Sequence, residues 1–232
     1  MTIHIMLDLE TWGTEPGCDI RSIGACVFDP VAGTIGGDIP FAHAGKGGTG
    51  PGSKNPFAFY IATDNPTGTW GRGRWRTKFT PMNHWKRKYP LTRDADTMRW
   101  WSEQSGEAQA AFADPVDLRE GLERFAAWLD AVRPFEGIGG AREYGSLRLW
   151  SHGSAFDPPI LAAAYKAVGL PVPWHYRAPR DTRTAFDMAG IEDHSAWLNQ
   201  HPGPLAIPHH ALDDAICQAR AVCGALARVV RP

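Results

Sequence analysis

Two acidic residues at the end of an apolar run constrain the fold of this chain more than any other feature. Residues 3–9 form a short apolar run bounded by polar residues, which predicts a buried β-strand. Asp8 and Glu10 lie two positions apart at its end, so their side chains point to the same side. Two carboxylates beside a buried sheet edge are costly unless a cation neutralises them. We therefore expect Mg²⁺ or Mn²⁺ here, although both side chains could instead face solvent at the strand end.

Apolar periodicity and turn residues predict the remaining elements. Further strands are expected at residues 20–28, 34–41 and 147–151. Helices are expected at residues 97–112, with Asp96 or Thr97 as the cap, and at 117–132, 158–168, 182–188 and 211–230. Strands followed by alternating helices and strands indicate an α/β fold in which helices flank one central mixed sheet. We expect a single domain over residues 1–232.

The segment at about 45–93 is interpreted as an insertion with little regular structure, because it is rich in Gly, Pro and Asn. It holds ten Lys or Arg and one acid, Asp64, whereas the other residues carry 14 Lys or Arg and 24 Asp or Glu. An acidic body with one basic segment suits a polyanionic ligand. Residues 70–93 also interleave aromatic and basic side chains, and Arg74, Trp75 and Arg76 are candidates for binding single-stranded nucleic acid. The alternative is a loop whose tryptophans pack on the body while its arginines face solvent.

Composition excludes several other classes of protein. The 232 residues include 43% hydrophobic residues and ten tryptophans, enough for a sizeable core and against extensive disorder. The four cysteines form no CxxC pair, which favours reduced thiols and a cytoplasmic location over disulfides or zinc. We expect no signal peptide and no membrane span, because the apolar stretches are too short.

A second acidic position follows the strand expected at residues 147–151. A Gly/Ser turn containing His152 precedes Asp157, and two prolines then open a helix. Asp157 is a candidate metal ligand, and a helix cap is an equally good interpretation. We interpret His152 as an ordinary loop histidine.

A third acidic position opens the last helix. His209 lies at or before the helix start, and Asp214 is about one and a half turns further on. His209 could therefore flank a metal ion held by Asp214 without binding it. Alternatively, Asp213 and Asp214 only complement the helix dipole. We expect His210 and Asp213 to be surface neighbours of the functional pair.

These motifs, taken in order, resemble the DEDD exonuclease superfamily, His subclass. The motifs are DxET near the N-terminus, FD before a helix, and HxALxDA opening a late helix. The resemblance implies a ribonuclease-H-like fold and two Mg²⁺ or Mn²⁺ ions held by Asp8, Glu10, Asp157 and Asp214. It implies that His209 is the general base and that Glu10 also helps to hold the attacking water.

The chain departs from the family pattern at two places. Trp12 replaces the second threonine of the usual DxETTG motif, which could change how the terminal nucleotide stacks against Thr11 and Trp12. The doubled histidine makes His210 an alternative general base. Arg180 and Arg183 are candidates for contact with backbone phosphates, or are simply solvated.

The resemblance leads to a functional expectation. Segments 100–104 (WWSEQ) and 180–184 (RDTRT) resemble the 3′→5′ exoribonuclease-like branch found in phages and actinobacteria. Asp181, in the second segment, either caps the following helix or orients the active site. We expect a 3′→5′ exonuclease acting on single-stranded nucleic acid or 3′ overhangs, with RNA slightly favoured, and a homodimer as in many relatives. The alternatives are a DNA-specific exonuclease of phage replication or repair, and an inactive nucleic-acid-binding module.

Overall fold

The computed structural model describes residues 2–36, 56–71, 74–76, 86–132 and 146–230. It contains strands and helices in the following order: β1 (Ile3–Thr11), β2 (Ile20–Asp29), β3 (Thr34–Ile35), β4 (Ala58–Asp64), β5 (Thr67–Gly71), β6 (Arg74–Arg76), β7 (Lys86–Arg87), α1 (Ala95–Ser102), α2 (Gly106–Ala110), β8 (Val116–Asp117), α3 (Leu118–Val132), β9 (Leu147–Ser151), α4 (Asp157–Ala167), β10 (Pro179–Asp181), α5 (Thr182–Met188), α6 (His194–Asn199) and α7 (Ala211–Val230).

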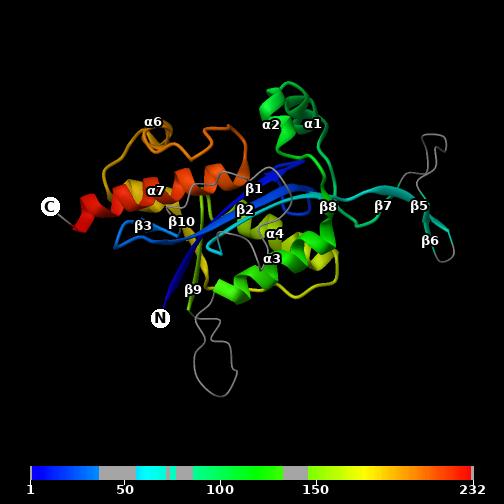
Figure 1. Cartoon of the computed structure of the whole chain (residues 1–232), viewed down its shortest axis with the longest axis horizontal. Coiled ribbons are helices and arrows are strands. Elements are labelled where there is room, and N and C mark those ends of the chain that lie inside the picture. Colours follow the sequence, from blue (N-terminus) through cyan, green and yellow to red (C-terminus); the bar gives the residue numbers. More distant parts are fainter. Residues whose placement is uncertain (1, 37–55, 72–73, 77–85, 133–145, 231–232) are drawn as a thin grey trace, which may run out of the picture.

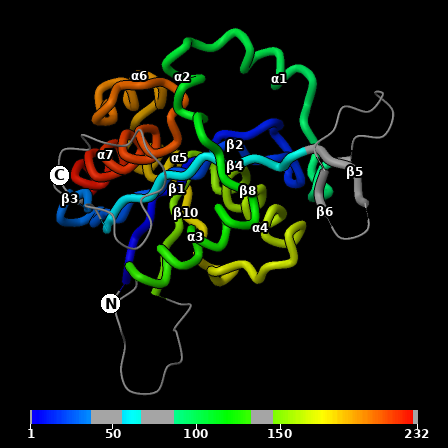
Figure 2. The backbone as a smooth tube through the Cα atoms, turned by 45° about the vertical axis from the view of Figure 1, so that its right-hand side comes forward, coloured from blue at the N-terminus to red at the C-terminus, as the bar shows by residue number. Residues whose placement is uncertain are grey.

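A seven-stranded mixed sheet forms the centre of the molecule (Figure 1). Its main path runs β10-β9-β1-β2-β4-β8, and β3 pairs with β2. Strand β2 runs antiparallel to β1 and β4, whereas β9 runs parallel to β1 and β10, and β8 runs parallel to β4. Helices α3 and α4 lie on one side of the sheet and α6 and α7 on the other (Figures 1 and 2). The expected α/β fold with a flanked mixed sheet is therefore confirmed.

Alternation along β1 assigns its side chains to two cores. Ile5, Leu7 and Leu9 pack into the cluster that includes α3 and α4. Met6 packs instead into the cluster that includes α5, α6 and α7. Because successive side chains of a strand face opposite sides, Asp8 and Glu10 continue the row of Met6. The strand thus directs both carboxylates to the face that α7 covers.

The prediction of an insertion with little regular structure at about 45–93 is wrong for β4. This strand pairs with β2 over five residues and places buried side chains such as Phe59 and Ile61 in the core. Its apolar run is short and is surrounded by Gly, Pro and Asn. The local composition therefore did not indicate a central strand. Strands β5, β6 and β7 form a separate three-stranded sheet within the same segment.

Two predicted boundaries also differ from the structure. The helix expected at 97–112 is two helices, because Ser105 caps a new helix, α2, by accepting from the N–H of Ala108. Helix α1 begins earlier than expected, and its cap is Asp94 rather than Asp96 or Thr97. The strand expected at 34–41 is observed at Thr34–Ile35, and residues 37–41 lie outside the described ranges.

The cysteine and membrane expectations can also be compared with the structure. The four cysteines are free thiols. In the described ranges, none of the helices has both the length and the apolar character needed to cross a membrane.

Candidate active site

Helix α7 approaches the acidic end of β1 because β2 carries a glycine there. Gly24 is the register partner of Asp8. A β-carbon at position 24 would overlap the backbone of Ala211 and Leu212, where α7 begins. Only a residue without a side chain allows this close contact. Gly24 therefore places the first turn of α7, which carries Asp214, against the strand pair that carries Asp8.

Asp157 is held against β1 by a backbone hydrogen bond. The N–H of Leu9 donates to Oδ1 of Asp157 at 3.1 Å. Helix α4 has Phe156 at its N-cap position, and no side chain makes a capping hydrogen bond there. The capping interpretation of Asp157 is therefore wrong. Its side chain instead accepts a hydrogen bond from Leu9, the residue between Asp8 and Glu10.

The HxALxDA motif at the start of α7 brings His209 and Asp214 to the carboxylates of β1. Glu10, His209 and Asp214 each offer a metal-ligating atom, and these atoms lie within 4.8 Å of one another. Glu10 and Asp157 are buried, whereas Asp8, His209 and Asp214 are partly exposed. The cluster therefore has an exposed side from which ions and substrate can approach.

Burial raises the pKa values of all four carboxyl groups, and repulsion among the four adds to this for Asp8 and Glu10. Burial raises the pKa of Asp157 to about 7 and, together with the neighbouring Asp213, that of Asp214 to about 7. The pKa of Asp8 is raised by desolvation and by Glu10, Asp157 and Asp214. Burial and the same two aspartates raise the pKa of Glu10, and Arg21 opposes this shift.

The donor set fits hard divalent cations. Among the described residues, none of the four carboxylates forms an ion pair with a lysine or arginine. Four clustered oxygen donors without a cationic side-chain partner match the ligands that Mg²⁺ and Mn²⁺ prefer. The buried Oε1 atom of Gln218, next to the cluster, also lacks a hydrogen-bond donor within the described part of the chain. Water molecules of a hydrated cation can supply such a donor.

His209 lies in the loop just before α7, in a left-handed conformation with a φ of +59°. This conformation is uncommon for residues other than glycine, and histidine adopts it more readily than most. Burial lowers its pKa from 6.5, which keeps a free nitrogen available to accept a proton.

The expectation that His210 and Asp213 are surface neighbours is wrong, because both are buried. The ring of His210 stacks on Tyr60 with a centroid separation of 4.3 Å. Asp213 accepts from the backbone N–H groups of Leu205 and Ile207 at 2.7 and 3.1 Å. These contacts fix the loop that carries His209 and leave His210 packed in the structure.

Aromatic and cationic side chains surround the position at which Trp12 replaces threonine. The guanidinium carbons of Arg21 and Arg93 lie 4.3 and 4.7 Å from the centroid of the Trp12 ring. Arg21 also lies 4.2 Å from the ring of Trp101, whose Nε1 donates to the carbonyl of Thr11 at 2.8 Å. The Thr11 hydroxyl donates to a nearby backbone carbonyl at 2.6 Å. Trp12 is therefore part of a packed cation–π assembly next to Glu10.

The two neighbouring tryptophans of α1 differ in exposure. Trp101 is 3% exposed and packs in the structure, whereas Trp100 is 41% exposed. The ring of Trp100 meets that of His209 edge to face, with a centroid separation of 4.8 Å. An exposed aromatic surface thus lies directly beside the candidate base.

The segment around β10 contributes one arginine to the site. Arg183 is exposed, lies against the turn at Gly153 and lowers the pKa of Asp157. Arg180 instead uses Nη1 to donate to the carbonyls of Arg177 and Pro179, both at 2.8 Å. Asp181 caps α5, as expected, and its second oxygen accepts from the N–H of Ser154.

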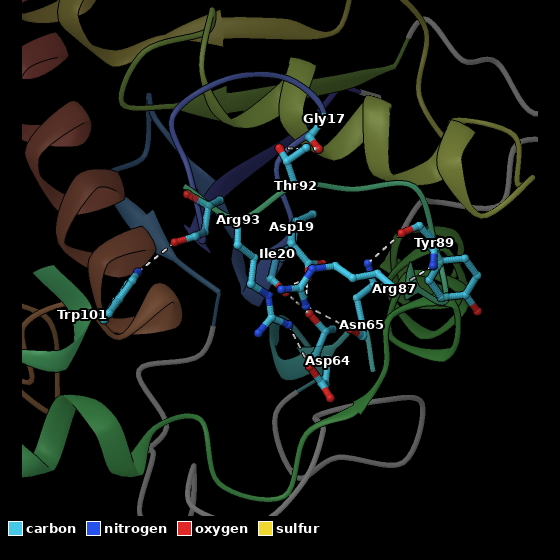
Figure 3. A network of polar contacts seen from close by, with 12 residues as sticks. Gly17, Asp19, Ile20, Asp64, Asn65, Arg87, Tyr89, Thr92, Arg93 and Trp101 are labelled. Atoms are coloured by element: carbon cyan, nitrogen blue, oxygen red, sulfur yellow. Dashed lines mark hydrogen bonds and ion pairs between the residues drawn. The ribbon is translucent and has the colours of Figure 1, made fainter. Parts of the chain in front are cut away.

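Part of the basic segment anchors the chain through ion pairs. Arg93 forms ion pairs with Asp19 and Asp64, both at 3.0 Å, and Arg87 lies 3.8 Å from Asp19 (Figure 3). The side chains of Arg74, Trp75 and Arg76 lie outside the described part of the structure.

Comparison with known families decides the affiliation of the chain. A family model described as the 3′-5′ exoribonuclease Rv2179c-like domain matches residues 3–225. The chain belongs to this family. The match spans β1, α4 and α7, so it includes every acidic position of the cluster, and it confirms the assignment to the DEDD exonucleases.

No curated protein matches the Rv2179c-like chain. Among solved structures, the zinc-bound form of an E. coli ExoI–ssDNA complex is similar, with a TM-score of 0.49 and 13% identity. The similarity covers 100% of this chain and 40% of that chain.

Three residues of the Rv2179c-like site were not predicted. Gly24 and Arg21 lie on β2, where the sequence shows only an apolar strand. Gln218 donates through Nε2 to Oδ1 of Asp8 at 2.8 Å. Its spacing of four residues from Asp214 places both on one face of the helix, so a signal for Gln218 was present.

Proposed function

We propose that this chain is a metal-dependent 3′→5′ exonuclease that hydrolyses phosphodiester bonds. The observation that carries the proposal is the convergence of carboxylates from β1, α4 and α7 beside His209. Residues about two hundred positions apart thus meet at one end of the sheet. The membership of the Rv2179c-like exoribonuclease family supports the same activity.

Asp8, Glu10, Asp157 and Asp214 would hold two Mg²⁺ or Mn²⁺ ions. When bound, such ions stabilise the charge of the attacking and leaving oxygens in phosphoryl transfer. The protein contributes a fixed arrangement of carboxylates, which the Leu9–Asp157 hydrogen bond and the close contact at Gly24 hold in place.

His209 acts as the general base that takes a proton from the attacking water. Its lowered pKa keeps the imidazole neutral at physiological pH, as a base requires. Its ligating nitrogen lies within 4.8 Å of the oxygens of Glu10 and Asp214. This proximity supports the proposal that Glu10 holds the same water. His210, stacked and buried, is the weaker candidate for this role.

The substrate is single-stranded nucleic acid or a 3′ overhang, and we favour RNA. Trp100 offers an exposed aromatic surface beside His209 on which a terminal base can stack. Arg183 is placed to contact a phosphate near Asp157, whereas Arg180 is a weaker candidate because Nη1 is already bonded to carbonyls. Thr11, Trp12, Arg74, Trp75 and Arg76 complete the proposed substrate-binding residues.

The proposal is tested by digestion of matched RNA and DNA oligonucleotides labelled at the 5′ end. With Mg²⁺ or Mn²⁺, we expect a ladder that shortens from the 3′ end and forms faster on RNA. Asp8→Ala should abolish the ladder, and Asp187→Ala, an exposed acid of α5, should leave it unchanged. Binding of the oligonucleotide without cleavage would identify a binding module instead, and normal digestion by Asp8→Ala would refute the metal site.

A further inference from the structure

Gln218 connects the two elements that carry most of the carboxylates. It lies on α7 four residues after Asp214, on the same face of the helix. Its side chain is 7% exposed, and Nε2 donates to Oδ1 of Asp8 at 2.8 Å. Within the described part of the chain, no other side chain donates to this carboxylate.

The orientation of the Gln218 amide follows from its partner. The amide nitrogen faces Asp8, to which it donates, and this is the orientation that suits a carboxylate acting as an acceptor. The amide oxygen then points elsewhere, and it is buried without a donor among the described residues. Burying a polar atom without a hydrogen-bond partner costs free energy, unless a group outside the protein, such as water, donates to it.

A neutral amide is chemically suited to this position. A lysine or arginine at 218 would form an ion pair with Asp8 and compete with a metal ion. An aspartate or glutamate would add a fifth negative charge to a cluster in which repulsion already raises the pKa of Asp8. A hydrophobic residue would leave Oδ1 without a donor. The amide orients the carboxylate, keeps its charge available and, among the described residues, leaves Oδ2 without a hydrogen-bond donor.

We propose that Gln218 is a positioning residue for the metal site, acting through Asp8. This inference rests on the proposed metal-dependent function. Gln218 holds Oδ1 of Asp8 so that the carboxylate is presented to the cation in one orientation, and its free amide oxygen accepts from water that hydrates the cation. Residues that orient metal ligands in this way commonly change affinity or activity by about 10- to 100-fold.

The test is direct Mn²⁺ binding to the full chain, measured by electron paramagnetic resonance without substrate. Gln218→Met keeps the size of the side chain and removes the donor, and we expect the Kd for Mn²⁺ to rise by about tenfold or more. Gln200→Met is the matched control, because Gln200 is exposed at the end of α6 and donates only to its own helix. Its Kd should equal that of the wild type.

A double-mutant cycle separates positioning from a general loss of structure. If Gln218 acts through Asp8, adding Gln218→Met to Asp8→Asn should change the Kd by less than about threefold. The rise in Tm on adding Mn²⁺, measured within each variant, keeps the comparison valid if Gln218→Met lowers basal stability. Wild-type protein that binds no Mn²⁺ would refute the proposed function itself. Wild-type binding with an unchanged Kd in Gln218→Met would overturn only the role of Gln218.

Discussion

The backbone N–H of Leu9 donates to the carboxylate of Asp157, and this bond joins α4 to the strand that carries Asp8 and Glu10. The backbone between Asp8 and Glu10 thus sets the position of Asp157. Asp157→Asn keeps an oxygen that can accept from Leu9 but removes the charge. We expect hydrolysis to fall by about 100-fold, because a metal ligand is weakened.

The same Asp157→Asn substitution should stabilise the metal-free protein, since a buried charge in a repulsive cluster is removed. Thermal unfolding in EDTA should show a higher Tm than for the wild type. A lower Tm together with normal hydrolysis would show that Asp157 has only a structural role.

The stability that the acidic cluster contributes to the metal-free protein should decrease as pH rises. Folding raises the pKa of Asp157 and of Asp214 from 3.8 to about 7, so between these values the folded protein binds protons that the unfolded chain has released. The contribution of these two groups to stability therefore falls as pH increases from about 4 to about 7. Histidines whose pKa burial lowers, such as His152, act in the opposite direction, so the measurement is the difference in Tm between Asp157→Asn and the wild type against pH in EDTA. The Tm of Asp157→Asn should rise relative to that of the wild type over this range, and a difference that does not change with pH would contradict the assignment.

The loop that carries His209 should be sensitive to Gly203. A β-carbon at position 203 would overlap Asp213, whose carboxylate holds the backbone of Leu205 and Ile207. Gly203→Ala should therefore displace the base and lower kcat by about 100-fold, while Mn²⁺ affinity changes little.

Gly106→Ala is the matched control for this loop substitution, because nothing lies within 4 Å of the β-carbon it would add. Its kcat should equal that of the wild type. If Gly203→Ala and Gly106→Ala both keep the wild-type kcat, the loop does not position the base.

Trp100 should contribute to substrate binding rather than to chemistry. Trp100→Ala removes the exposed ring beside His209, and we expect KM for a single-stranded oligonucleotide to rise by about tenfold with little change in kcat. Tyr176→Ala removes a more exposed aromatic ring from another segment and should leave KM unchanged. If both variants keep the wild-type KM, the substrate does not stack on Trp100.

The sequence was sufficient to predict residues whose role follows from spacing along one element. Asp8 and Glu10 are two apart on a strand, and Asp214 follows the start of a helix. The side chains of all three could therefore be assigned to defined faces of their elements. Contacts between elements were not predictable in this way. The Leu9–Asp157 bond and the packing of Gly24 on Ala211 depend on the tertiary arrangement.

Strand β4 was missed for a related reason. Its stability comes from pairing with β2 and from packing of Phe59 against α3, which local composition does not reveal. His210 and Asp213 were similarly misjudged, because polar residues at a helix start resemble solvent-exposed caps. Their burial depends on Tyr60 and on the preceding loop.

The most direct test of the central claim is a crystal structure of the protein with Mn²⁺, using anomalous scattering to locate the ions. We predict two peaks about 4 Å apart among Asp8, Glu10, Asp157 and Asp214, with His209 adjacent but not required as a ligand. Saturating Mn²⁺ that gives no peak within this cluster, or ions bound only elsewhere, would contradict the account.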